Sequence, residues 1–170
     1  MKKIPEITAL FWYMKICETT LGETAGDLLS MTMNVGHAMS SIILLSGFFV
    51  TLAAQLFSKQ YNPVIFWLVI LSTSTAGTTM AEYMDRTLGL GYATGSLILF
   101  YILGLILIVW RWSQKSLSVT NITTIKGELF YWTAILFSNT LGTAVGDYLA
   151  DNSGLGFGGG PILIGSIYLF

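Results

Sequence analysis

The chain has 170 residues, of which 54% are hydrophobic and 10% are charged, and its mean hydropathy is +0.70. Because a soluble domain carries roughly a quarter charged residues, this composition excludes an ordinary soluble domain and indicates an integral membrane protein in a lipid bilayer. Eight basic and nine acidic residues give a net charge of −1, which leaves no basic surface for nucleic acid. The single His37 and the single Cys17 exclude a bis-histidine haem, a histidine-rich zinc site and a disulfide within one chain, and we expect no cofactor.

Apolar stretches of about 20 residues follow one another along the sequence, and this is the length that crosses about 30 Å of hydrocarbon. They predict five complete spans, at about 8–30, 37–57, 63–83, 90–111 and 128–149, and a sixth that begins at about 157. The sixth reaches Phe170 after about 14 residues, whereas its two counterparts have about 21. We therefore expect this chain to be a fragment or a truncated product.

Four residue positions recur three times at constant spacing, which indicates an internal repeat. The copies are Trp12, Gly22, Asp27 and Gly36; Trp67, Gly77, Glu82 and Gly91; and Trp132, Gly142, Asp147 and Gly156. We assign the repeats to residues 1–60, 61–120 and 121–170, the last with one full span and an incomplete second span. The predicted fold is all-α, a polytopic helical membrane protein of tandem two-helix transmembrane hairpins. These repeats are parallel because each holds an even number of spans.

Basic residues are unevenly distributed between the two sides of the predicted spans. The N-terminus and the second and fourth connections carry Lys2, Lys3, Lys59, Arg111, Lys115 and Lys126. The first and third connections carry only Arg86. By the positive-inside rule the N-terminus is then cytoplasmic, and we expect a multi-pass protein of the cell inner membrane with an uncleaved first span.

Seven of the nine acidic residues lie in or just after the first helix of a repeat: Glu18, Glu23, Asp27, Glu82, Asp85, Asp147 and Asp151. An ionised side chain at bilayer depth costs about 2.5 to 3.5 kcal/mol on insertion scales, so such groups usually face a bundle interior or a wet cavity. The sequence therefore predicts a cation or proton pathway that contains Glu23, Asp27, Glu82, Asp147, Glu18, Thr19 and Lys15.

The first span shows the pattern in most detail. Thr19, Glu23 and Asp27 share one helix face at four-residue spacing, and Lys15 is the expected internal counter-charge. Carboxylate, threonine and carbonyl oxygens suit protons or hard cations such as Mg²⁺, Ca²⁺ or Mn²⁺ better than soft metals. Asp85 and Asp151, at the outer ends of their helices, are expected to be solvated caps.

Small residues accompany each acid at one-turn spacing, as Gly22 and Gly26, Gly77 and Ala81, and Gly142 and Gly146. Such residues let helix backbones approach closely in lipid, so we assign them to helix packing. The tryptophans are expected in an interfacial belt, and His37 is expected to be an interfacial ring, because Tyr92 and Phe157 hold its position in the other copies. The Gly-x-Gly-x-x-Gly match at 154, 156 and 159 follows no strand, so it predicts a turn or irregular backbone and no dinucleotide site.

Two stretches carry a resemblance to a known family: Phe11 to Ser30, with Glu18-Thr-Thr-Leu-Gly-Glu-Thr-Ala-Gly-Asp27 inside it, and Asn139-Thr-Leu-Gly-Thr-Ala-Val-Gly-Asp147. The chain resembles the bacterial uncharacterised membrane-anchored proteins built from tandem repeats of unknown function. The resemblance implies two spans and a characteristic tryptophan per repeat, with four repeats usual, but no activity. Glu23-Thr-Ala-Gly-Asp27 is also similar to the shorter Glu-x-Gly-Asp signature of cation exporters, from which the third copy departs at Thr143.

Three functions remain open. The leading one is transport of an inorganic cation or proton along the repeated carboxylates, without enzymatic activity. A non-catalytic membrane scaffold is the second. An intramembrane aspartyl hydrolase is the third, since two carboxylates can share one proton, although Thr24 and Ala144 replace the first glycine of a Gly-x-Gly-Asp pattern. A homo-oligomer is also open, since pairing chains would complete a bundle.

Overall fold

The computed structural model describes residues 5, 7–58, 60–115, 122, 124–154 and 156–168 and contains helices and no strand in these ranges. The long helices are α1 (Ala9–Asp27), α2 (His37–Phe57), α3 (Pro63–Glu82), α4 (Tyr92–Gln114), α5 (Ile125–Asp147) and α6 (Gly156–Tyr168). Three π-helical turns follow the odd-numbered helices, η1 (Leu28–Thr32), η2 (Tyr83–Thr87) and η4 (Tyr148–Asn152). The predicted all-α class is confirmed. Lys2, Lys3 and Lys59, on which the predicted orientation partly depends, lie outside the described residues.

In the part of the chain that the structure describes, three helices are long and apolar enough to cross a membrane, by length and composition: α2, α3 with η2, and α4. They have 21, 25 and 23 residues. The remaining two predicted complete spans form as helices, α1 with 19 residues and α5 with 23, but their charged residues make them more polar. The apolar side of α4 is exposed along its length, as expected of a surface that faces lipid.

Local signals in the sequence account for where the helices begin. The Thr8 and Thr124 hydroxyls accept hydrogen bonds from backbone N–H groups in the first turns of α1 and α5, and the Asn62 side chain does the same for α3. Gly36 and Gly91 precede α2 and α4 with φ of +82° and +74°, a left-handed conformation that glycine adopts without steric cost. The last glycine of the repeat pattern is therefore a turn residue.

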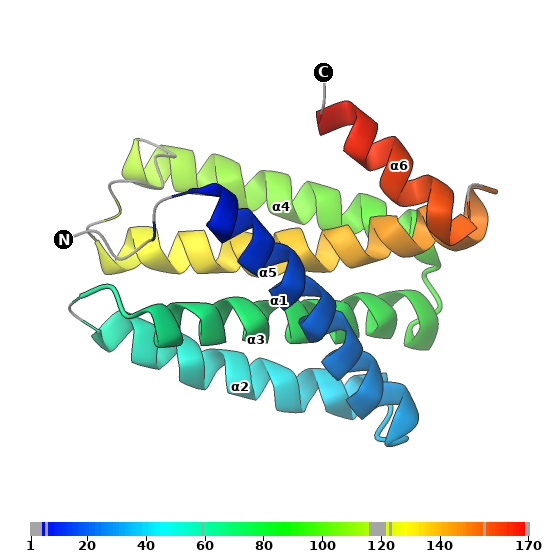
Figure 1. The fold of residues 1–170 in the computed structure, drawn as a ribbon, viewed down its shortest axis with the longest axis horizontal. Coiled ribbons are helices and arrows are strands. Elements are labelled where there is room, and N and C mark those ends of the chain that lie inside the picture. Colours follow the sequence, from blue (N-terminus) through cyan, green and yellow to red (C-terminus); the bar gives the residue numbers. More distant parts are fainter. Residues whose placement is uncertain are drawn as a thin grey trace.

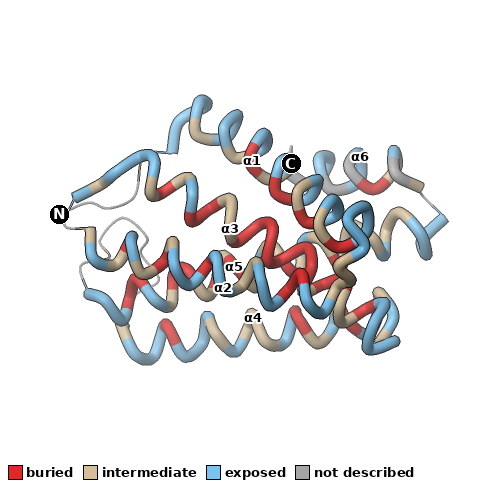
Figure 2. Tube along the Cα trace, turned by 90° about the horizontal axis from the view of Figure 1, so that it is seen from below, coloured by how far each residue is buried: buried red, intermediate tan, exposed pale blue. Residues whose placement is uncertain are grey.

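The first helices of the three repeats, α1, α3 and α5, run in the same direction, and α1 crosses α3 obliquely (Figure 1). The second helices of the first two repeats run the opposite way and pack mainly against the first helix of the following repeat, α2 on α3 and α4 on α5 (Figure 1). The core follows α3, where every residue from Thr73 to Thr79 is buried (Figure 2). Successive repeats are thus joined through their packing as well as through the chain.

Aromatic rings join successive first helices near their starts in a repeated way. Phe11 of α1 lies against Trp67 of α3 with ring centroids 5.6 Å apart, and Phe66 of α3 lies against Trp132 of α5 at the same distance. Trp132 is 1% exposed, so the interfacial-belt interpretation is wrong for this residue: it fills the contact between α3 and α5. Trp12, in the first repeat, is 58% exposed.

The small residues fall into two groups. A Cβ on Gly22 would overlap Ser74, and one on Gly77 would come within 3.0 Å of the Thr140 backbone nitrogen and 3.2 Å of the Asn139 side chain. Ser74 and Asn139 hold equivalent positions in their repeats, so the same close contact occurs twice. Gly26 lies near Thr78 in the same interface, and Ala81 is buried with Leu99 and Ala144.

Gly142 and Gly146 differ from the packing role that the sequence predicts. A Cβ on either would meet nothing within 4 Å, although both hold the repeat positions of Gly22 and Gly26. The reason is that no further first helix lies against this side of α5 in the described part of the chain. The two glycines instead border an open cleft.

Candidate functional site

The three repeated acids occupy the same structural position. Asp27, Glu82 and Asp147 are each the last residue of their α-helix, and each is followed directly by a π-helical turn of five residues. Such turns are rare and frequently occur at functional sites. Because α1, α3 and α5 are parallel and in register, all three acids lie at the same end of the bundle. The sequence predicted the recurrence of the acids but carries no signal for the change in helix type.

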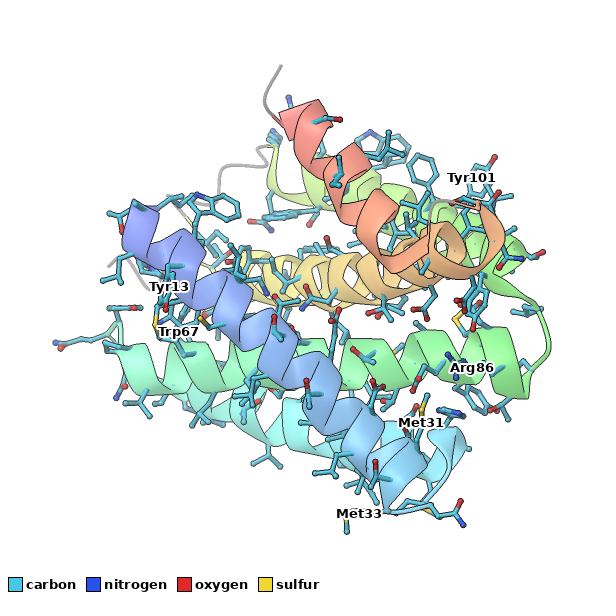
Figure 3. All side chains as sticks on the ribbon, turned by 45° about the vertical axis from the view of Figure 1, so that its right-hand side comes forward. Tyr13, Met31, Met33, Trp67, Arg86 and Tyr101 are labelled. Atoms are coloured by element: carbon cyan, nitrogen blue, oxygen red, sulfur yellow. The ribbon has the colours of Figure 1, made fainter. Side chains whose placement is uncertain are left out.

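The acids converge on a cleft of about 1280 Å³ between α1, α3, α5, η4 and α6. Its lining includes five carboxylate residues, Glu23, Asp27, Glu82, Asp147 and Asp151. Arg86 is the one basic residue among the lining residues in the described part of the chain. Arg86 and Met31, both of which line the cleft, lie at the end of the bundle where α1 stops (Figure 3). The cleft is therefore rich in negative charge.

On α1 the structure separates the predicted site residues into two stripes. Thr19, Glu23 and Asp27 line the cleft. Lys15 and Glu18 form an ion pair of 2.9 Å and are not among the lining residues. Glu18 lies one turn before Gly22, on the side that packs against α3, which turns it away from the stripe of Glu23.

The sequence suggested Lys15 as the counter-charge of the acids. In the structure, the basic residue that lines the cleft is Arg86 in η2. Arg86 lies within electrostatic range of Tyr92, Glu82 and Asp147. A guanidinium stays charged at every physiological pH, so Arg86 partly balances the acids of the second and third repeats. The sequence placed Arg86 in a connection, because it does not show that the helix continues through η2.

Glu82 is the most enclosed of the cleft acids, at 3% exposed. Its Oε2 accepts a hydrogen bond from the Ser30 hydroxyl at 3.3 Å and lies 3.0 Å from Nδ1 of His37. His37 therefore contacts an acid of the site, which its expected role as an interfacial ring did not include. The equivalent rings Tyr92 and Phe157 suggested a packing position, although His37 is the one imidazole of the three.

Asp85 is also placed differently from the prediction. It is 5% exposed, and both of its carboxylate oxygens are buried without a hydrogen-bond partner. The side chain lies so close to Gly95 in the first turn of α4 that a Cβ there would overlap it. The solvated-cap interpretation is thus wrong for Asp85, whereas Asp151 is exposed as expected.

A smaller cavity of about 230 Å³ extends the polar surface toward the middle of the bundle. It shares five lining residues with the main cleft, Thr19, Glu23, Thr78, Gly142 and Thr143. Ser74, Ser138 and Asn139 complete its polar lining, and the Asn139 amide donates to the hydroxyls of Thr73 (2.9 Å) and Ser74 (3.4 Å). The sequence prediction did not include these polar residues of α3 and α5.

In the ranges that the structure describes, no three His, Cys, Asp or Glu side chains come close enough together to hold a metal ion. The cleft instead presents separate carboxylates from three helices, with hydroxyl and amide groups between them. Such an arrangement offers successive acceptor positions for a proton or a small cation.

Apolar helices, parallel repeats and acids at the same position of each repeat define a polytopic helical membrane protein of repeated architecture. The chain matches the family described as Repeat of Unknown Function (DUF347) over residues 10–61, 65–116 and 130–169. It therefore belongs to this family, which confirms the resemblance noted from the sequence. Comparisons with curated proteins and with solved structures gave no match.

Proposed function

We propose that this protein transports protons or a small inorganic cation across the membrane through the cleft between α1, α3 and α5. The observation that carries the proposal is the convergence of acids from three repeats on one cavity: Glu23 and Asp27 from α1, Glu82 from α3 and Asp147 from α5. Acidic side chains in membrane-spanning helices concentrate in ion pathways and proton relays. No enzymatic activity is part of the proposal.

Electrostatics supports a positively charged species. Five carboxylate residues and one arginine line the cleft, so a cation that enters it lowers the repulsion among the acids. The smaller cavity adds hydroxyl and amide groups, which can replace water around the moving species partway along the helices.

The proposed orientation has a cytoplasmic N-terminus in the inner membrane. Among the described basic residues, Arg111, Lys115 and Lys126 lie where α4 ends and α5 begins. The acids lie at the opposite ends of α1, α3 and α5, so the carboxylate end of the cleft would face away from the cytoplasm.

A membrane scaffold is the second candidate, because the hydrogen bonds of Glu82 with Ser30 and His37 also join two repeats. In a scaffold these contacts would stabilise the bundle without moving any ion. The two candidates differ in what neutralisation of an acid does. A transporter loses flux, whereas a scaffold loses only stability.

The test compares two carboxylates on the same helix. The variants Glu23→Gln and Glu18→Gln make the same chemical change, but only Glu23 lines the cleft. In proteoliposomes assayed for proton, Mg²⁺, Ca²⁺ and Mn²⁺ flux, we expect Glu23→Gln to abolish the flux of wild type and Glu18→Gln to retain it. Flux in neither the wild type nor the variants, with all three folded, would favour the scaffold.

A further inference from the structure

His37 is the only histidine in the sequence, and the structure brings it to the acid of the following repeat. It is the first residue of α2, directly after the turn residue Gly36. The backbone N–H of Gly36 donates to the carbonyl of Ser30 at 3.0 Å, which closes the connection between η1 and α2. Ser30 and His37 of repeat 1 therefore reach the same oxygen atom, Oε2 of Glu82 in repeat 2.

Glu82 connects the cleft to this histidine. It lines the cleft, and its carboxylate lies within hydrogen-bond distance of the ring. The side chain of Glu82 is 4% exposed and that of His37 is 20% exposed, so the ring lies between a buried carboxylate and the surface. The adjoining connection is open to its surroundings, with Met33 63% exposed at the outer edge of the bundle (Figure 3).

The charges around this pair leave His37 as the group suited to proton exchange. Glu82 faces Asp27 at the end of α1, Asp147 at the end of α5 and Arg86 in η2. The turn η2, which packs against α2, also carries Tyr83 and Asp85. Histidine is the side chain whose ordinary pKa, about 6.5, puts its change of charge near neutral pH, and an arginine stays protonated there.

In the next repeat, the ring at the equivalent position is a phenol and not an imidazole. Tyr92 holds the position of His37 and lies within electrostatic range of Arg86 and Asp147. A phenol ordinarily releases its proton at about pH 10 and so does not exchange one at neutral pH. The two neighbouring repeats therefore share the position of the ring, but only the first has, at hydrogen-bond distance from the next acid, a ring that is ionisable near neutral pH.

We propose that the species moved through the cleft is the proton, and that His37 passes it between Glu82 and the aqueous surface beside the connection of η1 and α2. The proposal rests on the proposed function, because it takes the cleft as the pathway. Protonated Glu82 gives its proton to Nδ1 of neutral His37, which leaves a carboxylate and an imidazolium. The imidazolium then releases a proton from Nε2 to water, and tautomer exchange returns the ring to its starting form. The Ser30 hydroxyl stabilises the carboxylate meanwhile.

The experiment uses the full chain in liposomes that hold a trapped pH-sensitive dye, with proton movement driven by a potassium gradient and valinomycin. We expect His37→Ala and His37→Gln to lower proton flux by about 10²-fold, since positioned acid–base groups contribute at least this much to proton transfer. Imidazole added on both sides should restore flux to His37→Ala. Pyrazole, a ring of similar size that does not accept a proton at neutral pH, should not restore it. Protein-free liposomes and Glu82→Gln, each with imidazole, give the background.

Each outcome distinguishes the relay from a structural role. If His37→Ala does not fold, His37→Gln alone decides, because glutamine keeps a hydrogen-bonding side chain beside Glu82 but does not titrate near neutral pH. Wild-type flux in a folded His37→Gln would overturn the relay. Wild type that carries Mg²⁺, Ca²⁺ or Mn²⁺ but no protons would overturn it too and leave the proposed function standing. Absence of all four fluxes would overturn both.

Discussion

At the scale of single residues, the position of a polar side chain in this bundle depends on the space that the residue facing it leaves free. Asp85 and Gly95 show this most directly, since the carboxylate occupies the space that a side chain at position 95 would need. The equivalent pairs are Ser30 with Ser40 and Ala150 with Gly160. Repeat 1 thus has two serines at these positions and repeat 3 two small residues, and the carboxylate that fills the space beside a glycine occurs only in repeat 2.

This contact predicts that Gly95→Ala destabilises the protein by about 1 to 3 kcal/mol, the usual cost of forcing an extra carbon into a packed site. The new Cβ would overlap Asp85 and displace a buried carboxylate. Gly104→Ala, in the same helix with nothing within 4 Å of its Cβ, is the control and should be at least as stable as wild type, because alanine favours a helix more than glycine does.

The measurement is thermal unfolding in detergent. A double variant with serine at both positions, Asp85→Ser with Gly95→Ser, reproduces the pair found in repeat 1 and should recover most of the loss. Equal melting temperatures for Gly95→Ala and wild type would show that Asp85 does not lie against α4.

The sequence predicted the residues that recur in all three repeats. It missed residues whose role is found in one repeat only. Asp27, Glu82 and Asp147 recur, and the structure brings them to one cleft. His37 and Asp85 each differ from their equivalents, so the repeat gave no reason to place them at an acid or in the interior. A contact with a residue 45 positions away in sequence, as between His37 and Glu82, cannot be derived from helical periodicity.

At the scale of helices, the same kind of interface forms twice, between α1 and α3 and between α3 and α5. A phenylalanine of one first helix packs on the tryptophan of the next, and a glycine farther along packs on a polar residue of the next. The sequence predicted the small residues but not their partners. It also could not show that the second helix of a repeat packs against the following repeat. Packing against the first helix of its own repeat would require the same apolar faces.

The interface between α1 and α3 predicts a cross-link. A Cβ at Gly26 would lie 3.5 Å from the Cβ of Thr78, a separation that suits a disulfide. In a background with Cys17→Ser, which removes an exposed free thiol, the pair Gly26→Cys and Thr78→Cys should oxidise to an intramolecular disulfide.

Mass spectrometry of peptides from membranes treated with a mild oxidant detects the bond. The pair Gly104→Cys and Thr78→Cys is the control, since Gly104 has no neighbour near its Cβ. A cross-link in the control at the same rate, or none in the test pair, would contradict the packing of α1 on α3.

At the scale of the whole molecule, parallel repeats in register bring one type of position to one level of the bundle. The acids, the π-helical turns and the positive-φ glycines all recur at this level, and the cleft opens there between α1 and α5. Composition and span length predicted the helical membrane class and the repeat predicted the shared level. Neither predicted the cleft, because its lining depends on the angle at which α1 crosses α3.

The central claim is that the acids of the three repeats act in one pathway. The most direct test is ion flux in proteoliposomes for Asp27→Asn, Glu82→Gln and Asp147→Asn, each matched to wild type for folded protein. The account predicts that every one of the three variants loses the flux of the wild type, because each acid lines the same cleft. Wild-type flux in a folded variant of any of the three would contradict a shared pathway.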